Sequence, residues 1–190
     1  CDWSSDVCSS DLLLEGDVGS GKTLVATAVI AHTISHGGQT ALMVPTEVLA
    51  KQHVESIGKV LVGFYNYCQK KGLDIQCPRI ALLSGSVPKG QAREIKESIQ
   101  AGNIDLVIGT HSLIEDSVQF NDLKLVIVDE QHRFGVVQRN RLTSKGSPHF
   151  LSMTATPIPR TLALTAYGHH DLSVLTEKPG NRSPIDTKVI

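Results

Sequence analysis

The sequence predicts an α/β fold, in which a mostly parallel β-sheet carries helices on both of its faces. From Leu12 onward, short apolar runs rich in β-branched residues alternate with helical stretches, which is the rhythm of consecutive βαβ units. The first apolar run, residues 12–14, leads into a glycine-rich loop and then into a helical stretch. With 41% hydrophobic and 19% charged residues in a chain of 190, we expect a globular domain with one sizeable core.

The helices are predicted from their capping signals. The first begins near Lys22 and ends at Gly37-Gly38, because glycine is common just after a helix C-terminus. The second follows Thr46, whose hydroxyl suits the N-cap position, and the third starts at Pro88 and reaches Gln100. Two further helices are expected over residues 136–142 and 159–167.

The strands are predicted over the apolar segments between these helices. They are residues 12–14, 40–44, 79–83, 105–108, 123–128, 149–153 and 172–175. Residues 123–128 are nearly all apolar, which predicts a central strand that is buried on both faces. Residues 60–78 allow two interpretations, an extension of the second helix or a surface insertion. Their three aromatic residues would stack on bases or, as we favour, pack locally beneath a loop.

Residues 1–12 have no helix or strand periodicity and resemble the translated sequence of a sequencing-library adapter. We therefore expect a non-native leader at 1–12 and a domain at 13–190 that is truncated at both ends. Without the leader's three aspartates the net charge changes from −1 to +2. Such a charge argues against binding to nucleic acid through bulk electrostatics, but not through backbone amides and helix ends. No apolar run has membrane-spanning length and no secretory signal is present, so we expect no membrane partner and a cytoplasmic location.

The segment Gly16-Asp17-Val18-Gly19-Ser20-Gly21-Lys22-Thr23 matches the pattern G-x-x-x-x-G-K-[ST]. Its glycines let successive backbone N–H groups point at phosphate oxygens, and the following helix N-terminus adds its positive dipole end. Lys22 is expected to reach the outer phosphates, and the Thr23 hydroxyl to hold Mg²⁺. An ordinary glycine turn is the weaker alternative, because the loop lies between a predicted strand and a predicted helix. The motif predicts binding of a nucleoside triphosphate.

A second motif, Asp129-Glu130-Gln131-His132, follows the apolar residues 125–128. A buried strand would hold the two acids rigidly beside the phosphate loop. Asp129 would then hold Mg²⁺ directly or through water, and Glu130 would act as general base toward the attacking water. His132 would sense the γ-phosphate. A strand end with solvated acids is the alternative, and the presence of the phosphate loop makes it the weaker one.

Polar loops also follow the other predicted strands. They are Pro45-Thr46, Ser84-Gly85-Ser86, Gly109-Thr110-His111 and Thr154-Ala155-Thr156. Because loops after the carboxyl ends of strands carry the ligands of open α/β sheets, we expect the chemistry to converge on one edge of the domain.

These motifs together resemble those of superfamily 2 helicases. Residues 129–132 resemble helicase motif II, residues 154–156 motif III, residues 45–46 motif Ia and residues 109–111 motif Ib. The longer segments 16–23, 129–135 and 153–164 are similar to the RecG family of bacterial ATP-dependent DNA helicases, and the resemblance runs from about residue 13 to the C-terminus. The transcription-repair coupling factors share parts of these segments. They usually have Glu where this chain has Gln131 and Phe where it has Ser20, which favours the RecG family.

The resemblance implies a RecA-like P-loop NTPase domain, the first motor lobe of a double-stranded DNA translocase with ATP and Mg²⁺ as cofactors. The family remodels stalled replication forks and Holliday junctions in DNA repair and recombination, so branched double-stranded DNA is the implied partner. Residues Pro45, Thr46, Gly109, Thr110 and His111 would contact the DNA backbone. Thr154, Ala155 and Thr156 would couple the nucleotide state to the grip on DNA.

The resemblance also implies parts that these 190 residues do not contain. They are an adenine-contacting segment before the phosphate loop, a second RecA-like lobe with an arginine finger, and a wedge domain that recognises forks. Because an arginine finger raises turnover by several orders of magnitude, we expect this chain alone to bind Mg-ATP weakly and to hydrolyse it hardly at all. Two places depart from the family's pattern, the long connection at residues 60–78 and His169-His170, where an acidic residue is usual.

Two other classes of protein remain as alternatives. Another P-loop enzyme, such as a kinase or a transport ATPase, does not require this ordered series of strand-end motifs. A nucleotide-binding module without turnover does not require the intact set of Lys22, Thr23, Asp129 and Glu130, although the isolated fragment would behave in this way.

The remaining polar clusters are interpreted more simply. His32 and His36 lie four residues apart on one predicted helix but have no third metal ligand in view. Cys68 and Cys77 are expected to be ordinary, partly buried thiols. Three basic residues share one face of the third helix, and we interpret them first as a solvated face and second as a phosphate contact. They are Lys89, Arg93 and Lys96.

Overall fold

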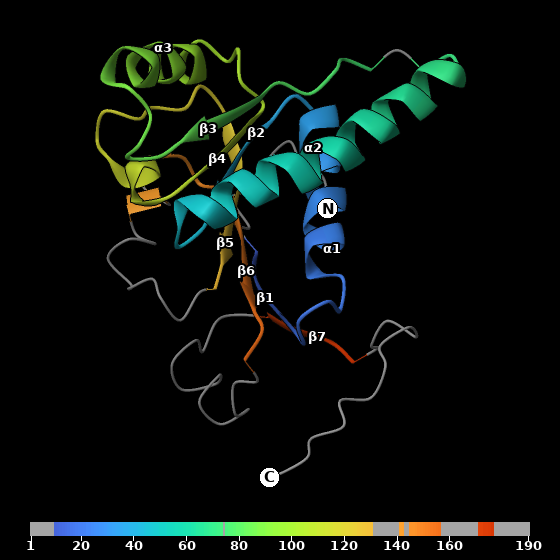
Figure 1. The fold of residues 1–190 in the computed structure, drawn as a ribbon. Coiled ribbons are helices and arrows are strands. Elements are labelled where there is room, and N and C mark those ends of the chain that lie inside the picture. The colour runs from blue at the N-terminus through green and yellow to red at the C-terminus, as the bar shows by residue number, and fades with distance from the viewer. Residues whose placement is uncertain (1–9, 74, 131–140, 143–144, 157–170, 177–190) are drawn as a thin grey trace, which may run out of the picture.

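The computed structural model describes residues 10–73, 75–130, 141–142, 145–156 and 171–176. Within them, seven strands form one sheet in the order β3-β4-β2-β5-β6-β1-β7, and all six neighbouring pairs are parallel (Figure 1). The elements are β1 (Asp11–Gly16), α1 (Lys22–Ser35), β2 (Gln39–Met43), α2 (Glu47–Lys70), β3 (Ile80–Leu83), α3 (Lys89–Gln100), β4 (Leu106–Gly109), the 3-10 helix η1 (His111–Ile114), β5 (Leu123–Asp129), β6 (His149–Thr154) and β7 (Asp171–Leu175). The predicted α/β class is confirmed.

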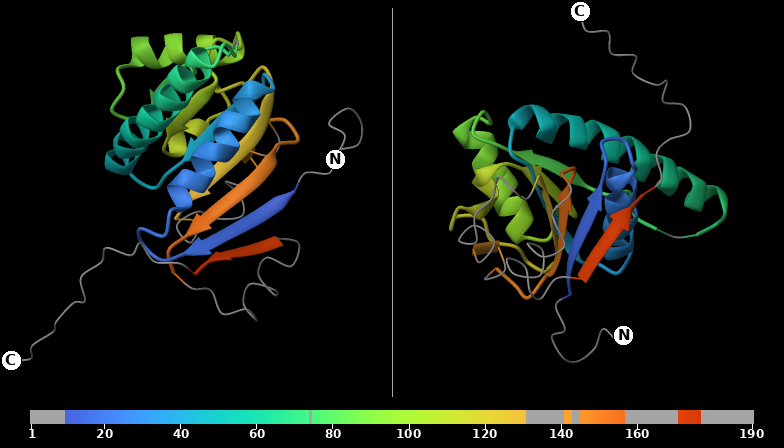
Figure 2. Two further views of the ribbon diagram at one scale, coloured as in Figure 1. Left: turned by 90° about the vertical axis from the view of Figure 1, so that its right-hand side faces the viewer. Right: turned by 90° about the horizontal axis from the view of Figure 1, so that it is seen from below.

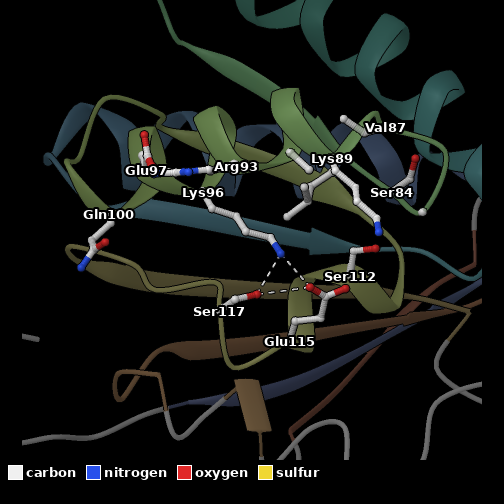
Figure 3. Close-up of a pocket in the computed structure, with 13 residues that line it drawn as sticks. Ser84, Val87, Lys89, Arg93, Lys96, Glu97, Gln100, Ser112, Glu115 and Ser117 are labelled. Atoms are coloured by element: carbon white, nitrogen blue, oxygen red, sulfur yellow. Dashed lines mark hydrogen bonds and ion pairs between the residues drawn. The ribbon is translucent and has the colours of Figure 1, made fainter.

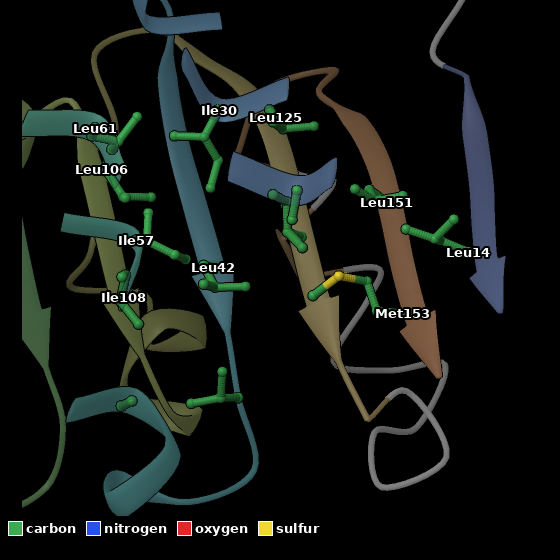
Figure 4. Close-up of a cluster of buried hydrophobic side chains, with 14 residues drawn as sticks. Leu14, Ile30, Leu42, Ile57, Leu61, Leu106, Ile108, Leu125, Leu151 and Met153 are labelled. Atoms are coloured by element: carbon green, nitrogen blue, oxygen red, sulfur yellow. The ribbon is translucent and has the colours of Figure 1, made fainter. Parts of the chain in front are cut away.

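The helices cover both faces of the sheet, because successive side chains of each strand point to opposite faces. In β5, Leu125 and Ile127 pack in the core cluster beneath α1 and α2, which Figure 4 shows. Val126 and Val128 pack in the second cluster, beneath α3 and η1. Figure 2 shows α1 and α2 side by side on one face and α3 on the other. Strand β5 has three strands on each side of it, so its predicted central place is confirmed.

The helix ends that the capping signals predicted are present in the structure. Helix α1 is followed by Gly37 at a φ of +79°, a left-handed conformation that glycine adopts without steric cost. The side chain of Thr46 caps α2 by accepting a hydrogen bond from the backbone N–H of Leu49 at 3.3 Å. Pro88 precedes the first residue of α3. The N-terminus of α2 is therefore set by the loop that follows β2.

Residues 60–70 extend the second helix, which runs without a break to Lys70. The prediction that the aromatic residues here pack beneath a loop is wrong for two of them. Phe64 is 47% exposed and Tyr67 is 59% exposed. The physical reason is that the C-terminal part of α2 extends beyond the edge of the sheet, as Figure 1 shows. This end of the helix therefore has little to pack against.

Strand β1 begins at Asp11, two residues before the expected start of the domain. Asp11 pairs with Phe150 of β6, and Leu12 pairs with Leu151 of β6 and with Asp171 of β7. The last two residues of the expected leader are thus part of the sheet. Of the two further helices that the sequence predicts, residues 141–142 are helical, and the remainder lies outside the described residues.

Gln39, at the start of β2, joins three segments at the edge of the sheet opposite the expected ligand edge. Its side-chain amide donates to the carbonyl oxygens of Ile99 at 3.0 Å and Ile104 at 2.7 Å. Its side-chain oxygen accepts hydrogen bonds from the backbone N–H groups of Asn121 at 2.8 Å and Asp122 at 3.0 Å. This buried side chain makes all four hydrogen bonds that a glutamine amide can make and so holds the three segments together.

Among the described helices, none is both long and apolar enough to span a bilayer.

Candidate nucleotide-binding site

The phosphate-binding motif forms a tight loop between β1 and α1. Gly19 and Gly21 have φ values of +82° and +94°, and the backbone N–H of Ser20 donates to the carbonyl oxygen of Asp17 at 3.1 Å. A side chain at Gly16 would place its Cβ atom 2.5 Å from the Ser20 hydroxyl, so the Ser20 side chain would have to move. The loop geometry therefore depends on the glycines that the motif specifies.

The N-terminus of α1 is suited to an anion. No side chain caps it, Gly21 takes the N-cap position, and its first turn contains no acidic residue. The first N–H groups of a helix have no intrahelical partner and carry the positive end of the dipole. A phosphate group is the kind of ligand that satisfies such an end.

Lys22 folds back over the loop that precedes it. Its ammonium donates to the carbonyl oxygens of Gly16 and Asp17, the latter at 3.0 Å. These contacts hold the positive charge directly above the loop. The neighbouring Thr23 is half-buried in the first turn of α1.

The two acids lie at the carboxyl end of β5. Asp129 is the last residue of the strand, and its Oδ1 atom accepts the backbone N–H of Glu130 at 3.1 Å. Glu130 has a φ of +56°, in the left-handed region that non-glycine residues seldom adopt. Such a conformation costs about 1–3 kcal/mol and is typical of functional sites, where the fold holds a residue in one orientation.

Strand β6 lies between β1 and β5 and brings the two motifs to one edge of the sheet. Met153 of β6 is in register with Leu14 of β1 on one side and with Asp129 of β5 on the other. Two strand spacings separate the backbones of β1 and β5, which is about 10 Å. Strands β1 and β5 run in the same direction, so their last residues, Gly16 and Asp129, lie at the same edge of the sheet. The ends of the two motifs therefore lie close enough together to contact one bound nucleotide.

The third motif ends the strand between them. Thr154 is buried at the end of β6, and its hydroxyl lies 3.1 Å from the Thr156 hydroxyl and accepts the Thr156 backbone N–H at 3.3 Å. Ala155 lies between them, half-buried. The segment 154–156 is therefore a closed polar turn between the phosphate loop and the acidic strand end.

The other strand-end loops occupy the second half of the same edge. They are residues 45–46 after β2, residues 84–86 after β3 and residues 109–111 after β4. The carboxylate of Glu47 accepts the backbone N–H of Ser86 at 2.9 Å, and hydrogen bonding from Ser86 holds the pKa of Glu47 below its ordinary value. Gly109 is buried against β3, while Thr110 and His111 lead into η1. Glu47 thus ties the start of α2 to the loop after β3, a contact that the sequence motifs did not indicate.

A pocket of about 580 Å³ lies beside these loops, between α3 and η1 (Figure 3). It is lined by the three basic residues of α3, but two of them are already paired. Arg93 is bonded to Glu97 at 2.8 Å, and Lys96 is bonded to Glu115 at 2.7 Å and to Ser117 at 2.8 Å. The interpretation of this face as mainly a solvated, ion-paired surface fits these contacts. Lys89, nearest to the strand ends, lines the same pocket.

Sequence reasoning missed His53, which lies on the buried face of α2 and contacts Asp129. Its Nε2 atom is 3.0 Å from Oδ2 of Asp129, and His53 is 8% exposed. The available signal was a polar residue inside the apolar stripe of a helix, since a buried polar group needs a partner. Of the predicted site residues, His132 lies outside the described part of the chain, as do Gln131 and Arg133.

The side chains at this edge fit a magnesium ion. The Thr23 hydroxyl and the Asp129 carboxylate carry hard oxygen atoms, the kind of ligand that Mg²⁺ prefers. Among the described residues, no cluster of three or more His, Cys, Asp or Glu side chains has the geometry to hold a metal. Mg²⁺ in nucleotide sites is usually held by one or two protein oxygens together with substrate phosphates, and the residues here match that pattern.

A parallel sheet with this glycine loop and this acidic strand end at one edge defines a RecA-like P-loop nucleotide-binding domain. The sequence profile of the DEAD/DEAH box helicase family matches residues 5–165. The chain belongs to this family.

Relatives with established names narrow the resemblance. The chain is 49% identical, over 182 residues, to the ATP-dependent DNA helicase RecG of Mycobacterium tuberculosis strain H37Rv. The matched region covers 94% of this chain and 25% of the relative. The chain is also 49% identical over 176 residues to the RecG of Bacillus subtilis strain 168, with 92% and 24% covered. The structure of RecG bound to a three-way DNA junction matches with a TM-score of 0.71 at 38% identity, over 93% of this chain and 22% of that one.

These comparisons confirm the predicted resemblance to RecG and the RecA-like fold. The chain spans about a quarter of the length of the curated relatives that it matches.

Proposed function

We propose that this chain is the ATP-binding motor lobe of an ATP-dependent DNA helicase of the RecG type. The observation that carries the proposal is the convergence of the phosphate loop and the Asp129-Glu130 strand end on one sheet edge, in a chain about half identical to RecG helicases. The alternative, a transcription-repair coupling factor, is less favoured, because the relatives at 49% identity are RecG helicases.

In this proposal the nucleotide lies across the edge between β1 and β5. The backbone N–H groups of residues 16–23 and the ammonium of Lys22 bind the phosphates. Thr23 and Asp129 hold Mg²⁺, which neutralises charge that develops on the phosphate oxygens. Glu130 orients and deprotonates the attacking water, and its backbone has a left-handed conformation at this strand end. His132 is proposed to sense the γ-phosphate.

The strand-end loops are the proposed DNA contact. Thr46, Gly109, Thr110 and His111, with Pro45, would meet the phosphate backbone through hydroxyls, amides and helix N-termini, which positions DNA without reading its sequence. Thr154 ends β6, the strand between the two halves of the nucleotide site, and Ala155 and Thr156 follow it. These three residues would couple the state of the nucleotide to the grip on DNA. Because a solved RecG is bound to a three-way junction, the proposed substrate is branched double-stranded DNA, such as forks and Holliday junctions in repair and recombination.

The complete enzyme needs more than this lobe. We propose that a second RecA-like lobe supplies an arginine finger and that a wedge domain recognises the branch, both in the full-length chain in the cytoplasm. We also propose that residues 1–12 are a leader foreign to the protein. The lobe by itself is expected to bind Mg-ATP weakly and to turn it over hardly at all.

Steady-state ATP hydrolysis, measured with and without a forked duplex, tests the proposal. The full-length protein should show DNA-stimulated hydrolysis and unwinding. Glu130→Gln should keep ATP binding and lose hydrolysis by about 10²–10⁴-fold, because it removes the base but keeps the shape. Unchanged turnover in that variant would remove Glu130 from its role. DNA-stimulated turnover by the 190-residue chain alone would refute the need for the second lobe.

A further inference from the structure

The buried contact between His53 and Asp129 joins two parts of the site that the motifs treat separately. His53 lies two turns along α2 from Thr46, the residue that caps the helix beside the proposed DNA contact. Asp129 ends β5, at the proposed metal site. The Nε2 and Oδ2 atoms are 3.0 Å apart, and the two side chains are only 10% and 16% exposed.

We propose that His53 is the positioning residue for the magnesium-binding carboxylate of Asp129, and that through it the metal site is tied to α2. This inference rests on the proposed function. A carboxylate can only accept hydrogen bonds, so Nε2 of His53 is the donor. Oδ1 of Asp129 is held separately by the backbone N–H of Glu130 at 3.1 Å. With one bond on each oxygen, the carboxylate cannot rotate, and each oxygen keeps a lone pair for a metal.

The choice of residue at position 53 supports a role beyond packing. On the same face of α2, Ala50 and Ile57 are 0% and 1% exposed and belong to the apolar core. An apolar side chain would fill this position without the cost of burying a polar ring. The hydrogen bond to Asp129 gives the buried imidazole a polar partner. The presence of Asp129 therefore explains why a histidine, and not an apolar residue, occupies position 53.

The helix that carries His53 gives this contact a mechanical consequence. Seven residues of helix separate His53 from Thr46, about 10 Å along one rigid element. A shift of the α2 N-terminus on DNA binding therefore moves Nε2 relative to Asp129. Because a hydrogen bond weakens steeply beyond about 3.5 Å, the orientation of the carboxylate depends on where α2 lies. By thermodynamic linkage, DNA and Mg²⁺ then affect each other's binding.

The experiment compares His53→Leu with His53→Gln in the full-length protein. Leucine keeps the volume and removes the donor, whereas the Gln side-chain amide nitrogen can occupy the place of Nε2. Gln52→Leu, an exposed position on the same helix, is the matched control. The affinity for a fluorescent ADP analogue is measured with excess Mg²⁺ and with EDTA. The ratio of the two affinities reports the metal contribution without any turnover.

Loss of a residue that orients a metal ligand typically lowers metal affinity by about 10- to 100-fold. His53→Leu should therefore reduce the Mg²⁺-dependent gain in affinity by at least about tenfold and leave the affinity in EDTA unchanged. His53→Gln and Gln52→Leu should keep the gain within about threefold of wild type. When nucleotide binding is followed as a function of Mg²⁺ concentration, adding a forked duplex should shift the midpoint of the curve for the wild type. It should not shift the midpoint for His53→Leu.

Three results would overturn the inference. They are a full Mg²⁺ gain in His53→Leu, an equal loss of affinity with and without Mg²⁺, and a His53→Gln variant as weak as His53→Leu. If His53→Leu does not fold, His53→Asn replaces it, because its shorter amide cannot reach Asp129; the Gln variant must then keep the gain that the Asn variant loses. A wild type that binds no nucleotide refutes the proposed function itself, which is a different outcome.

Discussion

Replacing Lys22 with alanine tests whether the phosphate loop binds a nucleotide as its geometry indicates. The ammonium of Lys22 now donates to two loop carbonyls, those of Gly16 and Asp17. A bound triphosphate would offer it charged oxygens in the same place. Nucleotide binding therefore exchanges two bonds to neutral acceptors for two bonds to charged acceptors. The difference in energy between the two kinds of bond sets the expected loss of affinity.

The magnitude follows from typical hydrogen-bond energies. Each bond to a carbonyl contributes about 1 kcal/mol net, and each bond to a charged group about 1.5–3 kcal/mol. For two bonds exchanged, the net gain from Lys22 is centred on about 2.5 kcal/mol, so Lys22→Ala should weaken ATP binding by roughly 70-fold. Folding stability should change little, because Lys22 lies at the partly exposed start of α1 and alanine is a good helix former.

The assay is titration of the full-length protein with a fluorescent ATP analogue in the presence of Mg²⁺, with thermal unfolding measured alongside. Lys59→Ala removes an exposed lysine from α2 and is the matched control, with an expected affinity equal to wild type. Affinity in Lys22→Ala within twofold of wild type would refute the assignment of the loop as the phosphate site. A large drop in unfolding temperature would instead show that Lys22 is needed to hold the loop.

Three further predictions concern the framework of the site. Gln39→Leu leaves partly buried amides and carbonyls without their partner, and should lower the free energy of unfolding by about 3 kcal/mol in urea denaturation. Gly109→Ala should lower it by about 2 kcal/mol or more in the same assay, because its Cβ atom would lie 2.0 Å from the carbonyl oxygen of Leu83. The Glu47 carboxyl, whose pKa is lowered by hydrogen bonding from Ser86, should stay ionised to a lower pH than a free glutamate in an NMR titration. Since the folded pKa is the lower one, this contact stabilises the fold above the unfolded pKa and is lost as the pH falls through the folded pKa.

Matched variants separate these effects from nonspecific damage. Gln91→Leu, at an exposed position of α3, should change stability by less than about 0.5 kcal/mol. Gly63→Ala, in α2 with open space around its Cβ position, should raise stability by up to about 1 kcal/mol. A Gly109→Ala variant as stable as wild type would contradict the close approach of β3 and β4. For Glu47, a carboxyl that titrates like a free glutamate would rule out the bond to Ser86. Ser86→Pro, which lacks both the hydroxyl and the backbone N–H, should reduce the lowering of the Glu47 pKa, and the smaller effects of Lys51 and Ser84 should remain.

Much of the fold was predictable because its signals are local. The chain order of apolar runs and helical stretches predicted a parallel sheet, and Thr46, Pro88 and Gly37 each marked a helix end that the structure contains. The start of β1 was predicted late, because Asp11 is polar and joins the sheet only through its pairing with β6. The exposed aromatic residues Phe64 and Tyr67 were also missed, since no local pattern reports that a helix extends past its sheet.

The sequence by itself determined the class of domain and the motifs of its site, because the phosphate loop and the acidic strand end are set by neighbouring residues and by strand order. Only the tertiary structure decided which side chains hold those motifs in place. His53 and Asp129 are 76 positions apart, and Glu47 and Ser86 are 39 apart. Their contacts depend on how α2 lies across the sheet, and that packing is set by an apolar core to which α1, α2 and several strands contribute, rather than by any short segment.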